Sequence, residues 1–287
     1  MDPQPTSLIC PRCGKLISGY LEECSHCGLA RPSRKQKWAI FLGQGGSVIR
    51  PIIGLCVLLF GLSYLLPLLS SSIPASQGSG FLKLLPAPSS AALAVLGWAD
   101  PRAILEGRWY LLVTAIFLHG GFLHIIFNLL WVRDLGTQAE ALLSPKVMFL
   151  VFVLTGAAGN LLAVFWPVIA NSIGFRTQFA PVVGASGAVF GLMGVIMSFA
   201  PRGAGYMGLG LSRQMGKWAL VMIALGFLMP GISNTAHIGG FISGWLLGKI
   251  IPVRSGVWAF ELAGVGAMGL VFYSFSAQFY QAYLWLR

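Results

Sequence analysis

The sequence predicts an all-α protein that crosses a membrane several times and carries a small metal-binding module at its amino terminus. Three observations lead to this prediction. Of the 287 residues, 56% are hydrophobic and only 9% are charged, whereas roughly a quarter of the residues in an average soluble domain are charged. The apolar residues gather in runs long enough to cross about 30 Å of hydrocarbon as helices. The amino-terminal residues, in contrast, are polar and rich in cysteine.

Residues 1–29 are predicted to form a zinc-ribbon-like cytoplasmic module. Two Cys-x-x-Cys pairs are separated by ten residues, and the four cysteines are Cys10, Cys13, Cys24 and Cys27. Each pair can place two thiolates on one tetrahedral zinc ion, and because four thiolates complete its coordination the zinc would be structural. Two disulfides or a redox dithiol are the alternatives, but disulfides need an oxidising compartment. His26, between the second pair, is a possible substitute ligand.

A basic linker at residues 30–47 follows the module and leads to a predicted six-span core at residues 48–251. One extra carboxyl-terminal transmembrane helix and tail occupy residues 252–287. The apolar runs place the seven spans at residues 48–70, 110–132, 147–167, 186–200, 217–231, 235–251 and 257–278. Residues 71–90, rich in serine and proline, and residues 98–109 are expected to form an external loop. The glycine-rich residues 203–210 are expected to be a flexible cytoplasmic connection.

Lysine and arginine determine the expected orientation, because positively charged loops stay on the cytoplasmic side. Most of the 19 basic residues precede the first span or lie in loops on the same side as the amino terminus. We therefore expect a cytoplasmic amino terminus and an external carboxyl terminus in a bacterial inner membrane. This topology explains the net charge of +11, so the lipid bilayer is the expected partner and nucleic acid is not.

Polar side chains within the predicted spans are the functional candidates, because placing them in hydrocarbon is costly. His124 and Asn128 are one turn apart on the second span and point the same way. Ser186 begins the fourth span, with Gly184 two residues before it and Gly187 directly after it. These small residues let another helix or a substrate backbone approach the serine hydroxyl. His237 lies in the sixth span, near the same external side as Ser186 in the expected topology.

These residue types suit peptide hydrolysis without a carboxylate. A serine hydroxyl becomes a good nucleophile when a neighbouring base accepts its proton, and histidine, with an ordinary pKa of roughly 6.5, suits that task. No aspartate or glutamate lies within the six predicted core spans. We therefore expect a dyad of Ser186 and His237 rather than a triad. His124 and Asn128 are suitable hydrogen-bond donors for the oxyanion of the tetrahedral intermediate.

In combination, three motifs resemble the signature of the rhomboid family of intramembrane serine proteases. They are HGGFLHIIFN in the second span, GASG at the start of the fourth and AHIGGFISG in the sixth. The resemblance covers about residues 48–251 and implies a six-helix rhomboid core. The last span, at residues 257–278, resembles the additional carboxyl-terminal helix of some members.

The resemblance also implies a role for each candidate residue. Ser186 would be the nucleophile and His237 the general base, while His124, Asn128 and the Ser186 amide would form the oxyanion hole. His119 matches the first histidine of the second-span motif and would have a supporting role. The implied reaction needs no cofactor, and the implied substrates are transmembrane proteins cut within or near their membrane segments.

One position departs from the family pattern, because Leu111 stands where an arginine is usual after Trp109. Two other functions stay open. The first is a catalytically silent rhomboid-like protein that binds membrane clients, and the second is a multi-pass transporter that uses the histidines. Docking of a protein partner is one open role for the zinc module.

Overall fold

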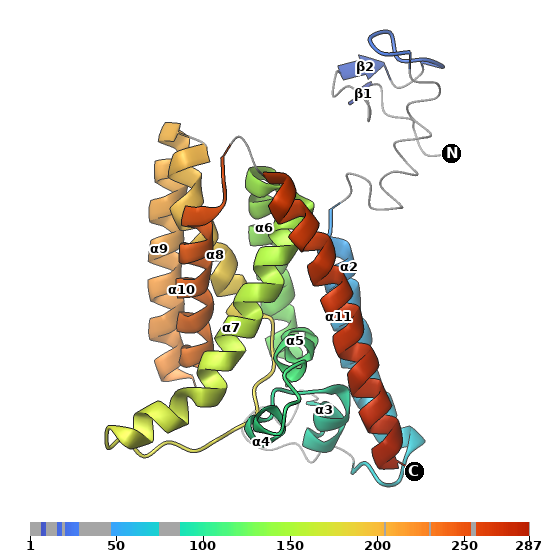
Figure 1. The fold of residues 1–287 in the computed structure, drawn as a ribbon, viewed down its shortest axis with the longest axis vertical. Helices are drawn as coiled ribbons and strands as arrows, with labels where there is room; N and C mark the ends of the chain where they lie inside the picture. The colour runs from blue at the N-terminus through green and yellow to red at the C-terminus, as the bar shows by residue number, and fades with distance from the viewer. Residues whose placement is uncertain are drawn as a thin grey trace. The chain divides into compact units, whose positions relative to one another are not determined.

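The computed structural model describes residues 7–9, 16–18, 21–28, 47–74, 87–203, 205–229, 231–253 and 257–286. The chain forms two compact units, Met1–Val48 and Ile49–Arg287. In the first unit, β1 (Ser7–Ile9) pairs antiparallel with β2 (Leu16–Ser18). The second unit consists of helices (Figure 1).

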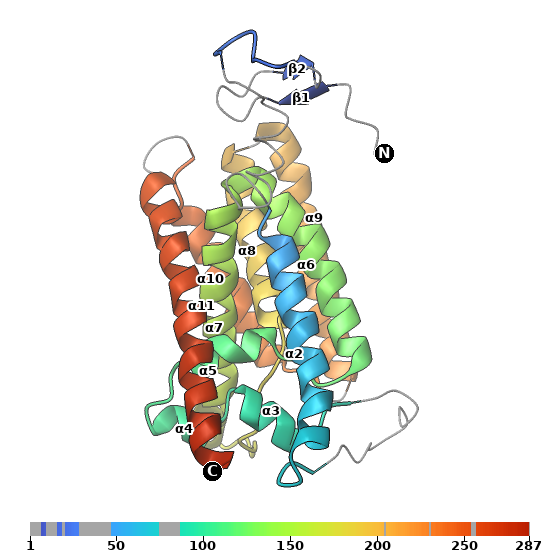
Figure 2. The same cartoon turned by 90° about the vertical axis from the view of Figure 1, so that its right-hand side faces the viewer.

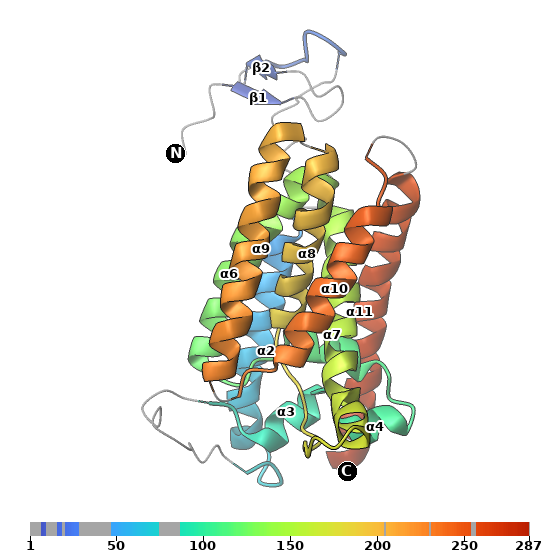
Figure 3. The same ribbon diagram turned by 90° about the vertical axis from the view of Figure 1, so that its left-hand side faces the viewer.

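The long helices of the second unit pack side by side. They are α2 (Ile49–Leu69), α6 (Phe122–Leu143), α7 (Pro145–Ser172), α8 (Ser186–Gly203), α9 (Gly205–Leu228), α10 (Asn234–Ile250) and α11 (Val257–Leu286). α8 contacts α6, α7, α9 and α10, and the last two lie beside it in Figure 3. α2 runs beside α6 (Figure 2), and α11 packs along α7. The candidate serine therefore begins the most enclosed helix of the bundle.

Short helices cluster toward one end of the long helices (Figure 1). They are α3 (Ser90–Leu96), α4 (Pro101–Leu105), α5 (Leu111–Thr114) and the 3-10 helix η1 (Ala115–Phe117). Asp100 caps α4, because its carboxylate accepts the N–H of Ala103 at 3.0 Å, and Pro101 occupies the first helical position. The expected external loop thus contains regular structure, and its apolar side chains pack against α7 around Val164.

Length and hydropathy mark several of these helices as membrane-spanning. Among the described residues, α2, α7 and α11 are individually long and apolar enough to cross a membrane, with hydropathies of 2.5, 2.2 and 1.4. α5, η1 and α6 would together make a fourth span with a sharp bend. α8 and α10 pack against α7, and α9 packs against α8. Seven complete crossings stay a prediction.

The predicted second span at residues 110–132 is not one straight helix. The axis bends by 93° between Leu111–Phe117 and Phe122–Leu143. The break contains Gly120 and Gly121, and adjacent glycines weaken a helix because they add backbone freedom without side-chain packing. α6 then continues to Leu143, beyond the predicted end.

The expected flexible connection at residues 203–210 is wrong for the part that the structure describes. α9 already begins at Gly205. Gly208 lies directly against the backbone carbonyl of Ala200, where a Cβ atom would collide with it. The glycines in this stretch therefore include one that permits a close helix contact.

Candidate active site

The segment before Ser186 is held by backbone hydrogen bonds to the short helices. Ala99 and Val182 form an antiparallel bridge, in which each N–H donates to the other carbonyl at 3.0 and 3.1 Å. The N–H of Gly184 donates to the carbonyl of Ala115 at 2.9 Å. Ser186 follows as the half-buried first residue of α8. Its position therefore depends on the short helices as well as on α8.

Gly184 occupies a position that requires glycine for two reasons. Its φ of 127° lies in a region that side chains disfavour. A Cβ atom here would also lie 2.7 Å from both Cε1 and Nε2 of His124. On the other edge of that ring, Nδ1 accepts the N–H of Gly120 at 3.3 Å. A neutral imidazole whose Nδ1 accepts carries its proton on Nε2, so a donor faces the backbone just before Ser186.

Ser186 and His237 lie on two helices that touch backbone to backbone. Gly240 of α10 lies directly against the carbonyl of Gly187, and Gly244 makes the equivalent contact one turn later. Because the contacts advance in the same direction along both helices, α8 and α10 run parallel. The first turns of the two helices, which contain the serine and the histidine, therefore lie at the same end of this glycine interface.

The ring of His237 is oriented by an aromatic contact. It stacks on Phe190 of α8, with centroids 4.2 Å apart and planes inclined by 12°. Phe190 lies one turn after Ser186, so the imidazole is held beside the start of α8. The described residues contain no hydrogen bond between the two candidate side chains, and Nδ1 of His237 has no partner among them. Such bonds often tighten only when substrate binds.

Asn128 and His119 are buried next to His124. The Asn128 amide donates one N–H to the carbonyl of His124 at 2.8 Å, so only its second N–H is available to a substrate. The ring of His119 packs edge-to-face on that of His124, with centroids 5.2 Å apart. His119 is 1% exposed, and neither of its ring nitrogens has a partner among the described residues. It supports the His124 ring by packing.

The electrostatics of this cluster favour negative charge near Ser186. The serine lies at the amino-terminal end of α8, where the backbone dipole carries partial positive charge. α6 continues past the predicted end of its span and therefore includes Asp134 and Glu140. Asp134 lies ten residues after His124, or about 15 Å along the helix axis at a rise of 1.5 Å per residue. Asp134 is also exposed. Donors and dipoles, rather than an α6 carboxylate, therefore determine the local field.

Supporting contacts between distant segments were not predicted from the sequence. The amide of Asn160 donates to the carbonyl of Leu112 at 2.9 Å, and the hydroxyl of Thr114 donates to the carbonyl of Gly97 at 2.5 Å. The amide of Gln278 donates to the carbonyls of Ala94 and Val95 at 3.2 and 2.8 Å. Asn160 and Gln278 each place an amide within an apolar span. Such a group requires an internal partner, so its presence in the sequence indicates a hydrogen bond to another segment.

The position that departs from the family pattern is part of the core. Leu111 is 3% exposed and packs among the apolar side chains of the short helices. Arg108 instead forms an ion pair with Glu106 at the surface, at 3.0 Å. Trp109 stacks on Phe165 of α7 with centroids 6.3 Å apart. An apolar residue at position 111 therefore suits its surroundings.

The candidate zinc ligands are only partly described. Cys10 and Cys13 lie outside the described residues. Cys24 is 3% exposed, and the N–H of Gly28 donates to its carbonyl at 2.9 Å, which closes a turn around Cys27. Gly28 has a φ of 67°, so the tight turn uses the freedom of glycine. Within the described part of the chain, no group of three or more His, Cys, Asp or Glu side chains could hold a metal ion.

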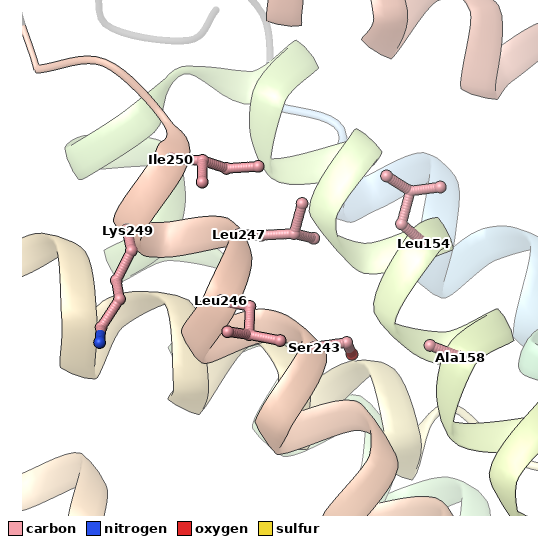
Figure 4. Close-up of a pocket in the computed structure, with 7 residues that line it drawn as sticks. All are labelled: Leu154, Ala158, Ser243, Leu246, Leu247, Lys249 and Ile250. Atoms are coloured by element: carbon pink, nitrogen blue, oxygen red, sulfur yellow. The ribbon is translucent and has the colours of Figure 1, made fainter.

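A separate groove of about 460 Å³ lies between α7 and α10 (Figure 4). Its lining is almost entirely apolar and comprises Leu154, Ala158, Ser243, Leu246, Leu247, Lys249 and Ile250. Lys249 points away from α7. None of the candidate catalytic side chains lines this groove, so it is distinct from the cluster around Ser186.

Comparisons with known proteins agree with the motifs. Residues 106–254 match the Rhomboid domain. The chain is 31% identical to RHOMBOID-like protein 5 of Arabidopsis thaliana over 179 residues, which is 60% of this chain and 53% of the relative. It is 29% identical to Rhomboid protease GluP of Bacillus subtilis (strain 168) over 154 residues, or 53% of this chain and 28% of that protein. Putative rhomboid protease YdcA of the same organism is 28% identical over 161 residues, or 54% of this chain and 76% of that protein.

The chain thus spans about half the length of the plant relative. The domain match covers more than half of the chain and includes both helices of the glycine interface. Together with the apolar helices, it identifies an integral membrane protein. The chain belongs to the rhomboid family.

Proposed function

We propose that the protein is an intramembrane serine endopeptidase that hydrolyses peptide bonds in or near the transmembrane segments of membrane proteins. The observation that carries the proposal is the glycine interface between α8 and α10, which aligns the first turns that contain Ser186 and His237. The family adds support, since relatives named as proteases share the domain.

In the proposed reaction, Nε2 of His237 accepts the proton of the Ser186 hydroxyl as Oγ attacks the scissile carbonyl carbon. The tetrahedral intermediate collapses when the imidazolium donates this proton to the leaving amine. A water molecule, deprotonated by the same imidazole, then attacks the carbonyl carbon of the acyl-enzyme. The bond from this carbon to Ser186 Oγ breaks as the imidazolium donates its proton to Oγ, which releases the new carboxyl group and restores the serine and the neutral imidazole. Stacking on Phe190 supports this dyad, because it holds the imidazole plane without a carboxylate.

The proposed oxyanion hole uses the Ser186 N–H, Nε2–H of His124 and the second amide N–H of Asn128. Each preorganised donor of this type contributes on the order of 3 kcal/mol to the transition state. His124 is the best supported side-chain donor, because Gly120 occupies its Nδ1 and Gly184 permits the approach of Nε2. We expect Asn128 to contribute less, since one N–H is already bonded to its own helix.

The distribution of basic residues supports an inner-membrane orientation with the amino terminus in the cytoplasm, and the dyad would then open to the external side. We further propose that Cys10, Cys13, Cys24 and Cys27 bind one structural zinc ion. The closed turn around Cys27 supports this assignment. With that orientation the zinc would lie across the membrane from the dyad, where a protein partner could dock on the module.

The decisive test is cleavage of a reporter transmembrane substrate in liposomes by wild type, Ser186→Ala and His237→Ala. Both variants are expected to lose cleavage by at least about 10³-fold, as other hydrolases do when a catalytic residue is removed. Ser198→Ala is the matched control, because its hydroxyl also lies on α8 but bonds back to the carbonyl of Gly194. Undiminished cleavage by either dyad variant would disprove the assignment.

A catalytically silent client-binding protein is the second candidate. The absence of a hydrogen bond between Ser186 and His237 among the described residues favours it. A serine-directed fluorophosphonate probe separates the two functions. Labelling of wild type but not of Ser186→Ala supports the protease, whereas failure to label or cleave in the wild type supports the silent protein.

A further inference from the structure

Helix α11 packs along α7 and also contacts the short helices α3 and α5, and one of its faces is buried. This face repeats every three or four residues, and its buried members are Gly264, Ala267, Val271, Ser274, Phe275 and Gln278. Phe275 packs on Phe117 of η1, with centroids 5.9 Å apart. Gln278 lies one turn further on and is the only amide side chain among these six residues. Burial of an amide is costly unless it is hydrogen-bonded. Its Oε1 has no partner among the described residues, so the bonds of Nε2 compensate for its burial.

Gln278 bonds to the carboxyl-terminal end of α3. Its Nε2 donates to the carbonyls of Ala94 and Val95 at 3.2 and 2.8 Å. The carbonyl of Ala94 also accepts the N–H of Gly97 at 3.1 Å. The carbonyl of Val95 lacks a partner within the helix, so for this carbonyl the amide acts as a cap supplied from elsewhere in the chain. α3 ends there at Gly97, which has a φ of 99°. A Cβ at Gly97 would meet Cγ of Gln278 at 2.9 Å, so this turn and the amide fit closely.

Hydrogen bonds, joined by one or two residues of backbone, connect this turn to the segment just before Ser186. Thr114 donates to the carbonyl of Gly97 at 2.5 Å, which joins the end of α3 to α5. Two residues after Gly97, Ala99 forms its two-bond bridge with Val182. One residue after Thr114, the carbonyl of Ala115 accepts the N–H of Gly184. Both connections end on the segment just before Ser186.

From this arrangement we infer that Gln278 is a positioning residue for the Gly184–Ser186 segment, and that α11 stabilises the candidate active site by capping α3. The inference rests on the proposed function for its effect on cleavage. The amide touches neither Ser186 nor a substrate. It acts through Gly97 and Thr114 on the backbone that presents the nucleophile and its N–H.

The test compares Gln278→Met with Gln281→Met in the full-length protein. Methionine retains the side-chain length but removes both donors, and Gln281 is an exposed glutamine on the same helix. We measure backbone hydrogen exchange in liposomes. In Gln278→Met, the amides of Ala99, Val182 and Gly184 are expected to exchange on the order of tenfold faster, because their local opening becomes easier. Gln281→Met is expected to match wild type.

Cleavage provides a second readout of the same variants. Because a displacement of about 1 Å costs up to ~100-fold in rate, kcat of Gln278→Met is expected to fall by tenfold or more at an unchanged KM. Exchange and kcat equal to those of Gln281→Met would overturn the inference. A uniform increase in exchange that includes α9 would also overturn it, because the effect would then be global destabilisation.

A second pair of variants keeps the inference testable if Gln278→Met does not fold. Thr114→Val removes the next hydroxyl in the set and is expected to accelerate exchange at Val182 and Gly184, whereas Thr114→Ser retains the hydroxyl and restores slow exchange. Equal exchange in both variants would contradict the connection. If wild type does not cleave at all, the proposed function fails, while the exchange comparison still decides the role of Gln278.

Discussion

Replacement of Gly240 by alanine is the most direct test of the glycine interface between α8 and α10. A Cβ atom at this position would lie 2.7 Å from the carbonyl carbon and 3.1 Å from the Cα of Gly187. Carbon atoms in contact prefer about 3.5 to 4.0 Å, and neither neighbour belongs to a side chain that can rotate away. The helices must therefore separate by about 1 Å near Ser186 and His237.

The expected consequence is larger for catalysis than for stability. Overpacking costs about 1 to 3 kcal/mol, and the better helix propensity of alanine offsets up to about 1 kcal/mol of this. A separation of about 1 Å between the nucleophile and its base reduces the rate by about 100-fold, or roughly 2.7 kcal/mol in activation free energy. Gly240→Ala is thus expected to remain folded while losing most of its cleavage activity.

The assay measures cleavage of the reporter substrate and the thermal unfolding midpoint in the same detergent. Gly269→Ala on α11 is the matched control, because no atom lies within 4 Å of its added Cβ. The control is expected to cleave like wild type and to be unchanged or slightly more stable. If Gly240→Ala cleaves as fast as this control, close approach of the two helices does not position the dyad and the reasoning is refuted.

Two further predictions concern Arg202 and the zinc module. Arg202 donates to three carbonyls at the end of α10, at 2.7, 2.6 and 2.9 Å, so Arg202→Gln is expected to lower the unfolding free energy by about 1 to 3 kcal/mol. Arg213→Gln, on the exposed face of α9, is the control, and equal unfolding midpoints would argue against this clamp. Cys24→Ser is expected to reduce bound zinc, measured by elemental analysis, below one equivalent per chain while cleavage continues. Cys56→Ala is the control and should retain zinc, because Cys56 is buried in α2, outside the zinc module. Full zinc occupancy in Cys24→Ser, or immediate loss of wild-type cleavage on chelation, would contradict the structural role.

Each candidate residue has a local signature in the sequence. Ser186, His237, His124 and Asn128 are polar groups in apolar runs, and the surrounding glycines indicate close approach. The structure brings the first three into one region through the glycine interface and the position of Gly184. Their catalytic roles stay predictions until cleavage and labelling are measured.

The path of the chain around these residues was harder to predict. Hydropathy is continuous through residues 110–132, so it gave no indication of the 93° bend next to Gly121. Composition likewise predicted a loop at residues 98–109, although its apolar side chains are buried against α7. The bend and the buried segment both depend on which surfaces of the folded protein are available for packing. A short stretch of sequence does not contain that information.

The sequence by itself determined the membrane class and the rhomboid family, because apolar composition and short motifs are properties of contiguous residues. Only the tertiary structure decided how Ser186 is supported. Gln278 bonds to carbonyls 183 and 184 positions away, and the bridge of Ala99 with Val182 joins two other segments. Such partners are chosen by packing in three dimensions, since a buried amide requires an internal partner but its own sequence does not specify which one.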